Sequence, residues 1–416
     1  MVTHALRSIL RSVALFAAGL GVLGIGSQSA YSQTQPVKVG AVLPYSGNLA
    51  WYGQEIGRGY ELAVKTINAR GGINGRPVEL AKADAPAATA AIGEVERLKN
   101  QGVKVIIGSG SSAVALAGSA AAAKHDIFYW ETNGLDNAYS TRGLKNAFQF
   151  APNNDDFVEV SISLLSDLGP KMLNKPLKDI TVGLAYENST YGMTQSKVQK
   201  EHLAKLGVKV VVDQSYSRTA SDLSPVVLQL RSANPDIVIE TGYQDDIVLM
   251  WRQAKELGYL PKMLISSGAA ATQDFANALG DKGVDGFIAY NYPFHEMPES
   301  GAPGAAEFAK AYQAAYGAPP PSGHSLAGYA GMIALADVIK AAGSDAFDAM
   351  VKAAHATDKP RGSYANGAGV KFNAGGRNER APVHGFQWQG GKLYTIYPAA
   401  VANSTPKGPL TPWDKR

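Results

Sequence analysis

The chain contains no cysteine. This absence excludes disulfide bonds, metal–thiolate sites and thiol nucleophiles. Histidine is scarce, with seven scattered residues, and the pair His295 and Glu296 lacks the second histidine of a zinc motif. We interpret His125, His324 and His384 as structural or surface residues. The sequence therefore predicts no metal site and no cofactor.

Signatures of catalysis and of nucleic-acid binding are also missing. No G-x-S-x-G elbow stands at the end of a predicted strand, and no lysine completes a P-loop. The formal net charge is +4, which falls to +2 without Arg7 and Arg11, and no run of five or more like charges occurs. These features argue against a nucleic-acid partner and leave an exported enzyme as a remote alternative.

An apolar run stands near the N-terminus at residues 13–25. The residues before it include Arg7 and Arg11 and no acidic residue, and small residues follow it at 27–32. Because the run is about half as long as a membrane-spanning helix requires, residues 1–32 are predicted to be a signal peptide, cleaved after Ala30 or Ser32. No cysteine follows, so no lipid anchor is expected. The G-x-G-x-x-G pattern at 19–24 lies in this leader and is interpreted as chance.

Strand-like and helix-like segments alternate along the remaining chain. Residues 37–43 alternate as a strand that stops at Pro44, and Ile56, Tyr60 and Ile67 then recur at helical spacing. Such alternation predicts mostly parallel sheets covered by helices on both faces. Further strands are expected at residues 78–83, 103–107, 127–131, 180–186, 208–214, 236–240, 263–266, 286–290, 370–372, 386–388 and 393–396, and further helices at 88–99, 112–123, 154–168, 194–206, 223–232 and 245–257.

The two halves of the chain begin alike, with a strand, a loop and a Tyr-Gly pair at Tyr52 and again at Tyr191. Residues 148–152 are short and extended, which suggests a crossing between lobes. We therefore predict a discontinuous α/β protein of two lobes with parallel sheets. The predicted bounds are 36–150 plus 291–365 for lobe 1, 151–290 plus 366–405 for lobe 2, and 406–416 for a C-terminal tail.

Several motifs occur in a fixed order: residues 43–53, GGINGRP at 71–77, IGSGSS at 107–112, YENSTYG at 186–192 and the segment 237–259. Together they resemble the periplasmic binding proteins for branched-chain amino acids, the type I solute receptors of ABC importers. The resemblance spans about residues 37–397. It implies two Rossmann-like lobes that are joined by a three-strand hinge and close on a small ligand. It also implies a periplasmic monomer that docks on an importer permease.

The resemblance assigns the ligand carboxylate to two loops. Ser112 matches the serine that holds it, with the backbone amides of residues 110–112 and Ser111 alongside. A Gly- and Ser-rich turn before a helix presents N–H groups to an anion, although both serines could instead only cap the helix. The second family segment falls on Asn133, Gly134 and Leu135, where Leu135 replaces the usual threonine hydroxyl.

The resemblance assigns the ligand ammonium group to Asp246, which replaces a longer glutamate. Asp245 and Asp246 could also be ordinary first-turn acids of a helix. Tyr52 and Tyr191 match the two aromatic residues that bracket the ligand, and structural packing is the alternative for both. Further tyrosines expected to complete the wall are Tyr45, Tyr243, Tyr290 and Tyr292.

Glu131 stands beside Trp130 at the end of a predicted strand. Two hypotheses remain open: the pair recognises a ligand cation, or Glu131 is a hydrogen-bonded acid near the hinge. The predicted ligand is a small amino acid or a related carboxylate. An aromatic or aliphatic carboxylate, an amide and urea are the alternatives, and a sensory domain of the same fold is a further class.

Overall fold

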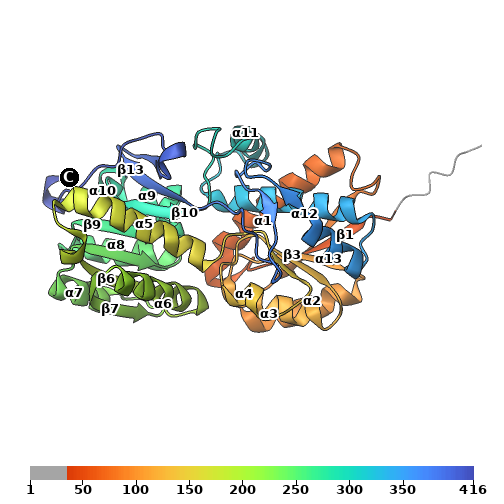
Figure 1. The fold of residues 1–416 in the computed structure, drawn as a ribbon, viewed down its shortest axis with the longest axis horizontal. Coiled ribbons are helices and arrows are strands. Elements are labelled where there is room, and N and C mark those ends of the chain that lie inside the picture. Colours follow the sequence, from red (N-terminus) through yellow and green to blue (C-terminus); the bar gives the residue numbers. More distant parts are fainter. Residues whose placement is uncertain (1–34) are drawn as a thin grey trace, which may run out of the picture. The chain divides into compact units, whose positions relative to one another are not determined.

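The computed structural model describes residues 35–416. The predicted signal peptide at 1–32, with its glycine pattern, lies outside the described residues. Within residues 35–416 the chain builds two main sheets, each flanked by helices (Figure 1). The predicted α/β architecture of two lobes is therefore confirmed.

Lobe 1 is built on a five-stranded parallel sheet. Its strands, in spatial order, are β2 (Val78–Asp84), β1 (Val37–Leu43), β3 (Val105–Gly108), β4 (Phe128–Glu131) and β5 (Ala147–Gln149). Its helices are α1 (Ala50–Ala69), α2 (Ala88–Asn100), α3 (Ser112–Ala123), α4 (Ala138–Thr141), α12 (Gly323–Ala342) and α13 (Phe347–Ala356).

Alternating side chains of the lobe 1 strands face two different helix layers. Ile107 and Phe128 pack with residues of α1 and α12, whereas Ile106 and Tyr129 pack with residues of α2 and α3. Successive residues of a strand point to opposite faces. A strand buried on both faces is consequently apolar throughout, which is why these short runs were recognisable in the sequence.

Lobe 2 is built on a seven-stranded sheet. Its strands, in spatial order, are β14 (Lys392–Tyr397), β13 (His384–Gln389), β10 (Ile288–Asn291), β9 (Met263–Ser267), β8 (Ile237–Thr241), β6 (Thr181–Glu187) and β7 (Lys209–Tyr216). Its helices are α5 (Asn154–Leu173), α6 (Thr190–Lys205), α7 (Ser224–Ala233), α8 (Gln244–Glu256), α9 (Gln273–Leu279) and α10 (Asp281–Val284).

The sheet of lobe 2 is mixed rather than wholly parallel. The strands from β7 to β10 run parallel, but β13 is antiparallel to both of its neighbours. β13 and β14 are joined through Gly390 and Gly391, whose φ angles are 59° and 79°. Two adjacent residues with positive φ form the tight turn of a β-hairpin, and a hairpin can only reverse the chain.

Three segments of the described chain pass between the lobes, near residues 150–153, 292–304 and 372–383. The first and third lie side by side, because Gln149 N–H donates to Gly376 O at 2.8 Å and Asn378 N–H donates to Gln149 O at 3.0 Å. The expected three-strand hinge is thus present. Beside it, β12 (Val370–Lys371) pairs with β11 (Asp358–Lys359). The residue bounds proposed for the lobes stay a prediction.

Helix α12 and α11 (Ala305–Tyr316) were not expected from the sequence. By length and composition α12 is the one described helix that could cross a membrane, yet 67% of its apolar window is buried inside the fold. It packs along α1 in lobe 1. Because α12 is buried nearly all round, it has no polar stripe and hence no helical periodicity to detect.

The C-terminal tail is bound to lobe 2. Leu410 N–H donates to Lys262 O at 2.8 Å, and Trp413 Nε1 donates to Tyr259 O at 2.7 Å. The Arg416 guanidinium donates to the backbone oxygens of three residues around the end of α10, which are Lys282, Gly283 and Asp285. The predicted tail at 406–416 is therefore an ordered part of the surface of lobe 2.

Candidate functional site

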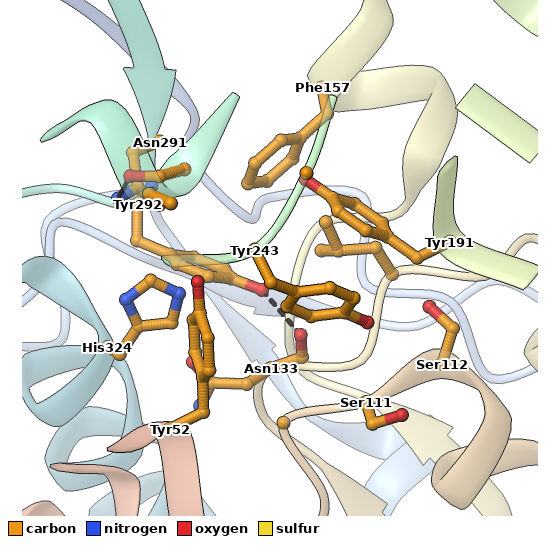
Figure 2. A pocket seen from close by; sticks show the side chains of 15 residues that line it. Tyr52, Ser111, Ser112, Asn133, Phe157, Tyr191, Tyr243, Asn291, Tyr292 and His324 are labelled. Carbon is orange, nitrogen blue, oxygen red and sulfur yellow. Dashed lines mark hydrogen bonds between the residues drawn. The ribbon is translucent and has the colours of Figure 1, made fainter. Parts of the chain in front are cut away.

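A cavity lies where the carboxyl ends of strands from both sheets meet. It is lined by the loops after β3, β4, β8, β9 and β10, together with the first turns of α1, α3, α5, α6 and α12. In open α/β sheets this edge is where ligands bind. The lining residues are Tyr52, Gly110, Ser111, Ser112, Asn133, Leu135 and His324 from lobe 1, and Phe157, Tyr191, Gly242, Tyr243, Gly268, Ala269, Asn291 and Tyr292 from lobe 2 and its connection (Figure 2).

Aromatic rings from both lobes meet in this cavity. Tyr52 of α1 contacts Tyr243 of lobe 2 with ring centroids 5.4 Å apart, and Tyr191 lies 5.2 Å from Tyr243 (Figure 2). The free volume is about 30 Å³, which holds water but no amino acid. Admission of a larger molecule therefore requires these rings or the lobes themselves to move apart. Burial holds the pKa of Tyr52 and Tyr191 well above the ordinary value, so both phenols are neutral.

Ser111 and Ser112 stand at the start of α3 and face the cavity (Figure 2). Ser111 is the N-cap residue, but its side chain makes no capping hydrogen bond. Gly110 has φ +72°, and a Cβ there would lie 2.6 Å from Ile56, so glycine permits this turn. The first N–H groups of a helix have no intrahelical acceptor, and here they lie at the wall of the cavity.

Glu131 lies behind the two loops that were assigned to a carboxylate. Its Oε1 accepts four backbone N–H groups, from Ser109 at 2.6 Å, Thr132 at 3.0 Å, Asn133 at 2.9 Å and Gly134 at 2.6 Å. The side chain is completely buried and does not line the cavity. Of the two hypotheses for Glu131, the structure matches the hydrogen-bonded acid, which ties the loop before α3 to the loop after β4.

The neighbours of Glu131 divide between cavity and interior. Trp130 lies in the core of lobe 1, stacked on Phe150 at 6.0 Å, and does not line the cavity. Asn133 and Leu135 line it, whereas Gly134 stands behind them, where a Cβ would lie 3.0 Å from the Glu131 carboxyl carbon. The backbone of Asn133 is fixed further by Tyr292, whose hydroxyl donates to Asn133 O at 2.7 Å (Figure 2).

Asp246 does not line the cavity. Its Oδ1 accepts the Tyr243 N–H at 2.8 Å, which caps the N-terminus of α8. The carboxyl group lies near Tyr216, Glu187 and Glu240 of lobe 2 and also near Tyr52 of the cavity wall. Its Oδ2 is buried and has no hydrogen-bond partner in the described chain. Burial, and next the negative charge of Glu187, raise the pKa of Asp246 to about 8. This is the arrangement of a first-turn helix acid, and a contact with a ligand ammonium group stays a prediction.

Two further expected wall residues lie away from the cavity. Tyr45 is half-buried, with the Lys82 ammonium 5.5 Å above its ring. Tyr290 is buried beneath the site, where its hydroxyl donates to Gln195 Oε1 at 2.9 Å. Tyr243 and Tyr292, by contrast, line the cavity as expected.

His324, Phe157 and Asn291 line the cavity but were not predicted as site residues. His324 comes from the first turn of α12, and its ring lies 5.0 Å from Tyr52 and 5.3 Å from Tyr292. Burial lowers the pKa of His324 to about 3, so the imidazole is neutral. A single histidine in a segment without helical periodicity carries no sequence signal that separates it from a structural one.

Hydrogen bonds at the rim of the cavity join the two lobes. Trp51 Nε1 donates to Asp274 Oδ2 at 2.7 Å, and Thr194 Oγ1 donates to Asp136 Oδ2 at 3.0 Å. Both bonds join a residue of lobe 1 to a residue of lobe 2. They stabilise the arrangement of the lobes that brings the two sides of the cavity together. In the described part of the chain, no group of three His, Asp or Glu residues is placed to hold a metal ion.

Comparisons with known proteins agree with this geometry. Residues 36–392 match the model of the family described as periplasmic binding protein. The Leu/Ile/Val-binding protein homolog 8 of Brucella suis biovar 1 (strain 1330) is 38% identical over 93% of this chain and 97% of its own length. Homolog 7 of the same strain is 37% identical over 88% of this chain and 93% of its own length.

Solved structures share the fold. The leucine binding protein LivK of Thermotoga maritima MSB8 superposes with a TM-score of 0.75 at 21% identity, covering 86% of this chain and 97% of that one. LivJ of Streptococcus pneumoniae, in complex with isoleucine, gives 0.74 at 19%, covering 88% and 100%. An ABC transporter solute binding protein of R. palustris, in complex with benzoate, gives 0.75 at 20%, covering 89% and 98%.

The two lobes, the cavity between them and the family match together define a type I periplasmic binding protein. The chain belongs to this family of solute-binding proteins, and its relatives at 37–38% identity are Leu/Ile/Val-binding protein homologs.

Proposed function

We propose that the protein is the exported solute-binding component of an ABC importer. It captures a small amino acid or a related carboxylate between its lobes and delivers the molecule to a membrane permease, without catalysis and as a monomer. The observation that carries this proposal is the cavity itself, because its wall is completed only by loops of both lobes. A ligand held there gains contacts from lobe 2 only when the lobes close.

Closure is then a consequence of differential binding. A ligand shifts the hinge equilibrium by the difference between its affinities for the closed and the open form. Tyr52 supplies a wall from lobe 1 and Tyr243 supplies a wall from lobe 2. The start of α3 offers N–H groups and the hydroxyls of Ser111 and Ser112 to an acid group. Micromolar affinity, about 8 kcal/mol, would suit uptake.

A thermal-shift panel tests the proposal. The mature protein is heated with each amino acid, with matched carboxylates and amides, and with urea. We expect a rise in melting temperature with at least one amino acid or carboxylate, because a ligand at about 1,000 times its Kd stabilises the folded form by about 4 kcal/mol. The absence of a shift with every amino acid and every carboxylate would overturn the proposal.

A matched pair of variants assigns the shift to the cavity. Tyr52→Ala removes a wall of the cavity and should abolish the ligand-induced shift. Tyr394→Ala, on the half-exposed strand β14 away from the cavity, should retain it. Equal shifts in both variants would place the binding elsewhere.

A further inference from the structure

Polar groups occupy two separate sides of the cavity. Ser111 and the start of α3 form one side, whereas His324 and Asn291 form the other (Figure 2). The rings of Tyr52 and Tyr243 lie between the two sides, since Tyr52 is 5.0 Å from His324 and 5.4 Å from Tyr243. A molecule that places its acid group at α3 therefore extends its other end toward His324 and Asn291.

His324 offers one ring nitrogen to the cavity. Its Nδ1 lies 3.2 Å from Ser322 Oγ, within the first turn of α12. No residue of the described chain forms a hydrogen bond with Nε2, although the side chain is only 6% exposed. Because burial lowers the pKa of His324 to about 3, the imidazole is neutral, and Nε2 is a donor or an acceptor according to the tautomer. A partner for Nε2 must come from the contents of the cavity.

Asn291 adds an amide group to the same side. Its Nδ2 donates to Gly268 O at 2.9 Å, and its Oδ1 accepts the Tyr292 N–H at 2.7 Å, so the amide is held in place. An amide has two N–H groups and two lone pairs, which leaves one of each without a use in these two bonds. Asn133, which also lines the cavity, has a buried Oδ1 without a partner in the described chain.

An apolar ligand end would leave these groups unpaired. A buried donor or acceptor that loses water without gaining a partner costs free energy, and a site built to hydrogen-bond a polar group rejects the analogue that lacks it. A carboxamide both donates and accepts, so it suits either tautomer of His324. The apolar residues of the wall, Phe157, Leu135 and Ala269, can still cover the carbon chain of such a ligand.

We infer that this site selects a ligand with two polar ends, an acid group at the start of α3 and a carboxamide or hydroxyl group at His324 and Asn291. The inference rests on the proposed function and deepens it. His324 is the specificity-determining residue, because its Nε2 has no other partner in the described chain. Hydrocarbon side chains of the same shape, such as that of leucine, bind more weakly.

The test compares ligands of matched shape that differ in polarity at the far end. Isothermal titration calorimetry at pH 7 pairs asparagine with leucine, succinamate with 4-methylpentanoate, and tyrosine with phenylalanine. We expect the polar member of at least one pair to bind ten-fold or more tightly than its apolar counterpart. A preference below ten-fold in every pair, with at least one compound bound, would show that the inference is wrong while the proposed function stands.

Two variants of His324 separate hydrogen bonding from packing. His324→Phe keeps a ring but no nitrogen, so the preference within the pair should fall to three-fold or less. His324→Gln keeps a donor and an acceptor and should retain the preference. His125→Phe, which lies directly after α3 at the opposite end of the helix from the cavity, is the control and should behave as wild type.

The preference is a ratio of two affinities in one protein, so a general loss of affinity cancels from it. An unchanged ratio in His324→Phe, or an equal loss in His324→Gln, would overturn the role of His324. If none of the six compounds binds, the inference fails; the proposed function fails with it only if the wider thermal-shift panel also yields no amino acid and no carboxylate.

Discussion

Glu131 does not line the cavity, but its replacement by glutamine should perturb two loops that form part of the cavity wall. Glu131 Oε1 accepts four backbone N–H groups at 2.6–3.0 Å, from the loop before α3 and from the loop after β4. Glutamine keeps the shape and one carbonyl oxygen but loses the charge. A hydrogen bond to a charged acceptor is roughly twice as strong as a neutral one, so each bond weakens by about 0.5–1 kcal/mol.

The summed loss for Glu131→Gln is then about 2–4 kcal/mol of unfolding free energy, which lowers the melting temperature by several degrees. Because the same bonds fix the start of α3 and the backbone of Asn133, we also expect the best carboxylate ligand to bind ten-fold or more weakly. Differential scanning fluorimetry measures the first effect and calorimetric titration the second.

Asp236 provides the matched control. It is likewise a buried carboxylate, and its Oδ2 accepts the Thr181 N–H at 3.0 Å, but it lies before the start of β8, at the opposite end of the strands from the cavity. Asp236→Asn should lower the melting temperature and leave the ligand affinity unchanged. If Glu131→Gln also keeps wild-type affinity, the carboxylate does not position the site and our reasoning about it is refuted.

Three further predictions concern the rim, the buried acids and the tail. Trp51→Phe removes the 2.7 Å bond to Asp274, so ligand release in stopped-flow experiments should become about 3–10-fold faster, and an unchanged rate would contradict a role in closure. The pKa of Asp246 is raised to about 8, so its contribution to stability is present below about pH 4 and is lost as the pH rises toward 8. Wild type should therefore lose unfolding free energy relative to Asp246→Asn over this range. A difference between the two proteins that stays constant with pH would refute the raised pKa. Deleting residues 413–416 removes the hydrogen bond from Trp413 Nε1 to Tyr259 O at 2.7 Å. The deletion should lower the unfolding free energy by about 1–3 kcal/mol in denaturant melts and leave the ligand affinity unchanged. Loss of ligand binding would show that the tail reaches the cleft.

The fold was predictable where burial of an element produces a recognisable apolar pattern in the sequence. Strands such as β3 and β6 are apolar runs because both faces are covered, and α1 shows Ile56, Tyr60 and Ile67 on one buried side. The same logic explains the failures. Helix α12 is buried nearly all round, so it has no amphipathic stripe, and β5 has only three residues.

The site was predictable as loops at strand ends, but not as individual contacts. Tyr52, Ser112 and Tyr191 line the cavity as expected. The direction of Asp246 could not be read from the sequence, because an acid two residues into a helix fits a cap and a ligand contact equally well. His324 escaped notice because its helix was not recognised.

Hydrogen–deuterium exchange with and without the best ligand of the thermal-shift panel tests the central claim most directly. If a small molecule closes the two lobes, amides should become protected in lobe 1 at residues 110–115 and 133–135, and also in lobe 2 at residues 242–247. Protection in a single lobe, or only at surfaces away from the cavity, would contradict binding by closure of the cleft.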